Sequence, residues 1–218
     1  LGTRHQIETL DRYLLYRDLF LEGCYFISVL MFLVIYIHRP ENRAWLYFAL
    51  LSLITAMRIS IYGAHLMTGI TDNYRFINFI EYSTRIWFPI LMLLLLNAAF
   101  SGNIAKWFTR GLVMTAAVLT GAVDILLIHI YTAFAPSLML FDFSMGIFML
   151  FLVLWPGGRF FPRNEHAIFL VYGMISVIAC GIYDLYIAST SYFEMTPIGF
   201  FIALLGVAFI LAITYTDA

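Results

Sequence analysis

Charged side chains are scarce in this chain. Only 11% of its 218 residues are Asp, Glu, Lys or Arg, whereas 63% are hydrophobic. An ordinary soluble domain carries roughly 25% charged residues, and a soluble fold of this length could not bury so much apolar surface. The net charge of -1 gives no reason to expect nucleic acid as a partner. The composition therefore predicts an integral membrane protein whose surface is covered by membrane lipids.

Lysine and cysteine are nearly absent. The one lysine, Lys106, falls between two apolar stretches, which excludes the retinal Schiff base of an opsin, because that linkage needs a lysine within a span. Cys24 and Cys180 lie in apolar runs without a Cys or His at metal-ligand spacing, so we expect free thiols. His65 and His129 also have no second His three or four residues away. We predict neither a metal site nor a cofactor.

Catalytic motifs are missing as well. The chain has no Gly-rich phosphate loop, nucleophile elbow, paired-His zinc motif or kinase signature, so we do not expect it to be an enzyme. It begins at Leu1 without a methionine and ends at Ala218 directly after an apolar run. We interpret it as a piece of a longer protein.

Seven apolar stretches follow one another, each about as long as a helix needs to cross a bilayer. Turn sequences such as Pro156-Gly157-Gly158 separate most of them, whereas the division between the fourth and fifth rests on Pro136 and on length. The predicted fold is all-α, a seven-transmembrane helix bundle within residues 19–218. The predicted spans are residues 19–37, 44–67, 77–100, 111–131, 136–155, 167–188 and 197–215.

The segment 1–18 is amphipathic and lies next to the membrane. It suits either a short helix at the membrane surface or an extension of the first span. Ile7, Leu10 and Leu14 share its apolar face, and Arg17 and Asp18 fall elsewhere.

The orientation of the bundle follows from the basic residues of its loops. The loops after the first, third and fifth spans hold six Lys or Arg residues, whereas the other side holds four, namely Arg75 and three in the leading segment. Because cytoplasmic loops are enriched in Lys and Arg, we predict the N-terminus outside and the C-terminus in the cytoplasm. Trp45, Trp107 and Trp155 then mark the inner boundary.

Two polar stripes occur within the second and third spans. Residues three and four apart share one face of a helix, so the stripes are predicted to be facing walls of a helical hairpin. An ionisable side chain inside a span costs roughly 2.5 to 3.5 kcal/mol on insertion scales and normally faces a partner or water. The stripes comprise Thr55, Arg58, Tyr62 and His65, then Asn78, Glu81, Tyr82 and Arg85.

The intramembrane charges share one depth, the outer half of the predicted bundle. Carboxylates occur there at Glu22, Glu81, Asp124, Asp142 and Asp184, and they fit an outward-facing polar vestibule. We predict that a small-molecule ligand binds in this vestibule or in a preceding extracytoplasmic domain. The candidate ligand-binding residues are Arg58, Tyr62, Glu81, Tyr82, Arg85, Asp124 and Asp142.

Structural roles for the same residues stay open. Arg58 and Arg85 could pair with Glu81 and Glu22 only to fix the register of the helices, because buried ions usually occur in pairs. Glu22 and Asp184 are also shallow enough to extend into the headgroups. Small residues, Ala117 with Gly121 and Gly199 with Ala203, are of the kind that helix packing uses.

The sequence between Gly23 and Arg85 resembles a known family. His38-Arg39-Pro40-Glu41-Asn42 lies between two spans, Leu46-Tyr47-Phe48-Ala49-Leu50-Leu51 and Ile54-Thr55-Ala56-Met57-Arg58 follow, and Ile80-Glu81-Tyr82 opens the third span. These residues are similar to the bacterial seven-transmembrane receptors with diverse intracellular signalling modules (7TMR-DISM). The resemblance implies a bacterial inner-membrane sensor with a domain before the bundle and a cytoplasmic output module in cis. That module would be a histidine kinase, as in two-component systems, a diguanylate cyclase or a phosphatase.

We therefore expect a transmembrane signal-transduction receptor. A transporter or proton-coupled permease is an alternative, with Glu81, Asp124 and Asp142 as relay groups. A passive anchor and dimerisation unit is a third, and the sequence is compatible with a homodimer.

Overall fold

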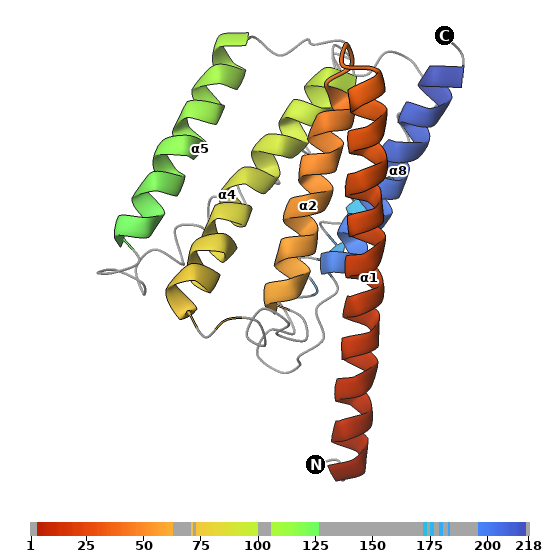
Figure 1. Cartoon of the computed structure of the whole chain (residues 1–218), viewed down its shortest axis with the longest axis vertical. Helices are drawn as coiled ribbons and strands as arrows, with labels where there is room; N and C mark the ends of the chain where they lie inside the picture. Colours follow the sequence, from red (N-terminus) through yellow and green to blue (C-terminus); the bar gives the residue numbers. More distant parts are fainter. Residues whose placement is uncertain are drawn as a thin grey trace.

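The fold is that of a computed structural model, which describes residues 4–62, 71, 73–99, 106–126, 172–173, 175–176, 179–180, 183 and 196–216. Throughout these residues the regular secondary structure is helical and contains no strand, which confirms the predicted all-α class. The helices are α1 (Arg4–His38), α2 (Ala44–Tyr62), α4 (Tyr74–Ala99), α5 (Lys106–Leu126) and α8 (Thr196–Thr216) (Figure 1).

These helices coincide with five of the seven predicted spans. Helices α1, α2, α4 and α5 follow the first four spans, and α8 follows the seventh. The fifth span, residues 136–155, lies outside the described residues, and the sixth is described at only a few positions. The number of spans and the orientation of the bundle stay predictions.

Helix α1 is continuous over 35 residues, which gives a length of about 52 Å at 1.5 Å per residue. The described residues before Leu19 thus belong to the same helix as the first predicted span, and this part of α1 projects past the other helices (Figure 1). Because α1 is one unbroken helix, the face that it buries at its C-terminal half continues into its N-terminal half. Asp18 lies on the same face as Leu21 and Tyr25, three and seven residues later, and all three are buried.

Two expectations for this segment were therefore wrong. Arg17 and Asp18 were expected away from the packed face, but both are largely buried. Their position follows from the face that the rest of α1 turns toward the bundle.

Side-chain caps and turns delimit the helices. The backbone N–H of Arg39 donates to Ile35 O at 2.9 Å as α1 ends, and Pro40 follows in the turn. Asn42 Oδ1 accepts the backbone N–H of Ala44 at 2.9 Å at the start of α2. Asn73 Oδ1 likewise accepts the N–H of Phe76 at 3.2 Å at the start of α4. Asn is among the preferred residues at such N-termini, because its oxygen satisfies an N–H that has no partner within the helix.

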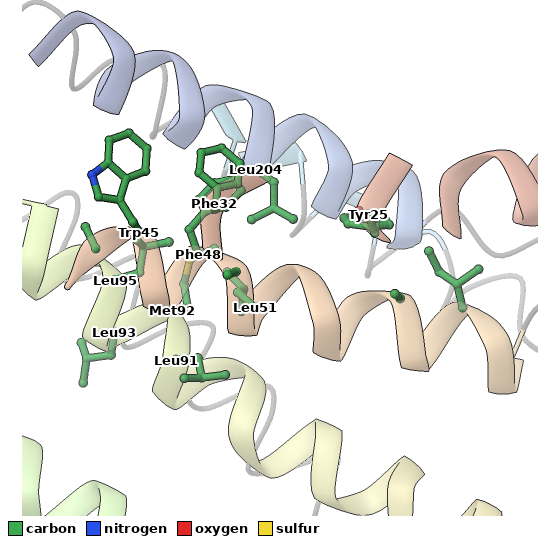
Figure 2. Packing of buried hydrophobic residues seen from close by; sticks show 14 of the residues in the cluster. Tyr25, Phe32, Trp45, Phe48, Leu51, Leu91, Met92, Leu93, Leu95 and Leu204 are labelled. Carbon is green, nitrogen blue, oxygen red and sulfur yellow. The ribbon is translucent and has the colours of Figure 1, made fainter. Parts of the chain in front are cut away.

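Helix α2 occupies the centre of the described bundle and contacts α1, α4 and α8, whereas α5 packs on α4. An aromatic cluster joins α1 to α2: the Phe32 ring stacks on Trp45 at 5.5 Å between centroids and lies 4.1 Å from Phe48 (Figure 2). Helix α8 adds two ring contacts, Phe201 with Tyr25 of α1 and Phe200 with Phe88 of α4. The core therefore spans four helices.

Small residues set the contact between α8 and residues 173–180. An ideal Cβ at Gly199 would lie 3.0 Å from Cys180 Sγ, and one at Gly173 would lie 2.8 Å from Ala203 Cα. Ser176 Oγ lies 3.1 Å from Gly199 O, to which it donates a hydrogen bond. The predicted packing role of Gly199 and Ala203 is confirmed. Ala117 and Gly121 are instead exposed on α5.

Among the described residues, two helical stretches, Arg12–His38 and Ala44–Ile61, are long and apolar enough to cross a membrane. The outward face of α1 is apolar and well exposed at Ile27, Leu30, Val34 and Ile37. Length and composition of these helices thus support a membrane protein.

Candidate functional site

The ion pair between Glu81 and Arg85 is the centre of the candidate site. Arg85 Nη2 lies 3.2 Å from Glu81 Oε1, and each side chain is 16% exposed. The two residues are four apart on α4, so the pair lies along a single helix. The sequence left open that Arg58 and Arg85 pair with Glu81 and Glu22 to fix the register of the helices, and this ion pair by itself joins no two helices.

Tyr82 extends this site toward α5. The Arg85 guanidinium carbon lies 5.9 Å from the centroid of the Tyr82 ring, within the range of a cation–π contact. The ring is buried in a cluster with Ile86 and Ile90 of α4 and with Ala116 of α5. Tyr82 therefore combines a packing role with a contact to the charged pair.

A second polar group lies where α1 meets the end of α2. Ser60 Oγ of α2 donates a short hydrogen bond to Glu22 Oε1 of α1. One turn earlier on α1, Arg17 Nη2 lies 2.7 Å from Asp18 Oδ1, and Asp18 is 1% exposed. The Asp18 Oδ2 atom makes no hydrogen bond among the described residues.

The two polar groups lie at the same end of the bundle. Ile61 follows Ser60 directly and packs against Ile77 and Ile80 of α4, beside Glu81. Glu22, Glu81 and Arg85 thus lie toward the same end of the described helices, and their depth in a membrane stays a prediction. The isoleucines Ile61, Ile77 and Ile80 form an apolar contact between α2 and α4 at this end. Whether the two polar stripes face one another stays a prediction, because His65 and the side chain of Tyr62 lie outside the described residues.

The remaining predicted residues are placed less completely. Arg58 is half-buried on α2, two residues before Ser60. Tyr62 is the last residue of α2 and Asp124 lies in the last turn of α5, and their side chains are outside the described part. Asp142 also lies outside the described residues. The structure therefore assembles Glu81, Tyr82 and Arg85 and leaves the other members of the vestibule as predictions.

Sequence reasoning missed Asp18 and Ser60. Asp18 and Glu22 are four residues apart, a spacing that predicts a shared face had α1 been extended backwards through residue 18. Ser60 carries no such signal, because it is an isolated hydroxyl in an apolar span. Its role arises from the crossing of α1 and α2.

This end of the bundle contains two ion pairs, Arg17–Asp18 and Glu81–Arg85, and a hydrogen bond from Ser60 to Glu22. Among the described residues, no group of three or more His, Cys, Asp or Glu side chains could hold a metal ion. The arrangement suits exchange of partners at Arg85, whose charge an incoming anion could take over from Glu81.

No protein-family model, curated protein or solved structure matches this chain.

Proposed function

We propose that this chain is the transmembrane sensor portion of a bacterial inner-membrane receptor. An extracytoplasmic ligand or partner would shift the helices at the Glu81–Arg85 end, and the shift would reach a cytoplasmic output module. The resemblance of residues 23–85 to the bacterial seven-transmembrane receptors supports this proposal. A histidine kinase, diguanylate cyclase or phosphatase is the expected output.

The observation that carries the proposal is the construction of α1. It is one continuous helix that projects beyond the bundle, and its aromatic contacts with α2 at Phe32 lie about 15 Å along the helix from Glu22. A displacement of the projecting end therefore moves both contacts with α2 together. Helix α8 receives the same displacement through Tyr25 and Phe201, whose ring centroids are 5.9 Å apart.

Signalling further requires two states with different affinity for the ligand. The Glu81–Arg85 pair supplies a local difference between such states. In one state Arg85 is paired with Glu81, and in the other Arg85 binds an anionic group of the ligand. Neutralising Glu81 mimics the loss of the first pairing and should favour the second state.

The test measures helix positions directly. Spin labels on cysteines at Tyr16 of α1 and Leu205 of α8, both exposed, report their separation in nanodiscs when Cys24 and Cys180 are replaced by alanine. We expect two populated distances whose ratio changes in Glu81→Gln. The matched control is Glu41→Gln, which removes an exposed carboxylate from the turn between α1 and α2.

A single distance that is the same in the parent and in both variants would refute a two-state sensor and favour a passive anchor. Proton flux through vesicles that contain the protein would instead indicate a transporter.

A further inference from the structure

The end of the bundle opposite the Glu81–Arg85 pair is basic. The turn between α1 and α2 and the first turn of α5 lie at this end (Figure 1). Arg43 directly precedes α2 and is exposed, and Arg110 is exposed on the second turn of α5. Neither helix has an acidic residue in its first turn. Two helix N-termini are thus flanked by cations.

The charges at this end come from helix termini as well as from side chains, because α1, α4 and α8 end here while α2 and α5 begin here (Figure 1). The N-terminus of a helix carries about half a positive elementary charge, so acidic residues stabilise it and basic residues do not. Glu41 is the only acidic residue within 38–43, where it is accompanied by Arg39 and Arg43. The two arginines thus outnumber the one carboxylate of this turn, which favours contact with an anion.

Helix α5 shows which environment supplies that anion. Trp107, Arg110 and Met114 are three and four residues apart, share one face and are all exposed, with Trp107 at 77%. Val118 continues the apolar part of this face one turn further along. An exposed Trp at the end of an apolar helical face is typical of the membrane–water interface. From its position beside Trp107, the guanidinium of Arg110 can reach the headgroups.

We propose that this end of the bundle binds anionic phospholipid headgroups. The guanidinium groups of Arg43 and Arg110 contact lipid phosphates, and the indole of Trp107 lies at the level of the headgroups. The phosphates neutralise the two exposed guanidinium groups. This inference requires insertion in a bilayer but not a receptor function, so the helix-distance experiment can fail while this one succeeds.

The experiment compares lipids around the full chain in phosphatidylcholine vesicles that carry a trace of spin-labelled lipid. The measured quantity is the relative association of labelled phosphatidylglycerol over labelled phosphatidylcholine. We expect a preference for phosphatidylglycerol that falls roughly fivefold for each arginine replaced in Arg43→Gln and Arg110→Gln. The preference should also fall in 0.5 M NaCl, because salt screens exposed charges.

Arg12→Gln with Arg75→Gln is the matched control, because both arginines are exposed and lie toward the other end. This variant should keep the preference. Equal loss in the control and test variants would overturn the assignment of the site. A parent protein without any preference, or with one that salt does not change, would overturn the proposal even if the Arg43 and Arg110 variants did not fold.

Discussion

Ser60 of α2 donates a hydrogen bond to Glu22 of α1 across 38 residues of sequence. Apolar contacts elsewhere along these two helices tolerate small translations, but a hydroxyl bonded to a carboxylate does not. The Ser60–Glu22 hydrogen bond therefore adds a directional polar contact to the apolar packing of α1 on α2. Its strength is the first quantity to measure.

Replacing Ser60 by alanine should destabilise the bundle, because Glu22 loses this donor while it remains half-buried. We expect a loss of about 1 kcal/mol, as for other hydrogen bonds between membrane helices. Thermal unfolding in detergent measures the change. Ser28→Ala is the control, because Ser28 Oγ donates only within α1, to Cys24 O at 2.8 Å. If both alanine variants unfolded at the same temperature, the hydrogen bond between α1 and α2 would not contribute to stability.

The contact between α4 and α5 should depend on a second hydrogen bond. Trp87 Nε1 donates to Thr120 Oγ1 at 3.0 Å. Thr120→Val keeps the shape of the side chain but removes the acceptor, and we expect it to lower the free energy of unfolding by roughly 0.5 to 1.5 kcal/mol. Thr115→Val removes only a bond to Gly111 O within α5 and should have a smaller effect. Combining Thr120→Val with Trp87→Phe should cost less than the sum of the two changes, and strict additivity would argue against the bond.

Glycine at position 173 should be irreplaceable. A Cβ there would lie 2.8 Å from the Cα atom of Ala203, so the backbone of α8 must move. We expect Gly173→Ala to cost about 1 to 3 kcal/mol, the range of overpacked cores. Gly111→Ala meets no described atom within 4 Å and should be neutral or stabilising, since Ala favours the helix. Unfolding temperatures that ranked the two variants in the opposite order would contradict this packing.

The aromatic cluster should contribute more than exposed aromatic rings of the same helix. Phe32 is buried against Trp45 and Phe48, whereas Phe26 is about half exposed. Phe32→Ala should lower the free energy of unfolding by about 3 to 5 kcal/mol, because it leaves a cavity. Phe26→Ala is the matched variant and should change it far less, because lipid or detergent fills the space. Equal losses would mean that the cluster is not the core of the α1–α2 contact.

The length of the apolar stretches in the sequence was enough to locate the helices that the structure describes. Apolar length located α1, α2, α4, α5 and α8, because a helix in lipid must satisfy its own backbone hydrogen bonds. The pairing of Glu81 with Arg85 was also within reach, since residues four apart on a helix are neighbours wherever that helix packs. The small residues Gly199 and Ala203 likewise indicated a close contact before its partner was known.

Composition and local spacing thus indicated a helical chain with apolar stretches long enough to cross a bilayer, since these properties depend on each helix alone. Burial of Asp18, the Ser60–Glu22 bond and the isoleucine contact between α2 and α4 depend on how the helices rotate and cross. Rotation is set by the summed packing of many side chains from different helices, which no short stretch of sequence contains. For that reason Glu22, Glu81 and Arg85 were singled out from the sequence, while the burial of Asp18 and the hydrogen bond from Ser60 became known from the folded bundle.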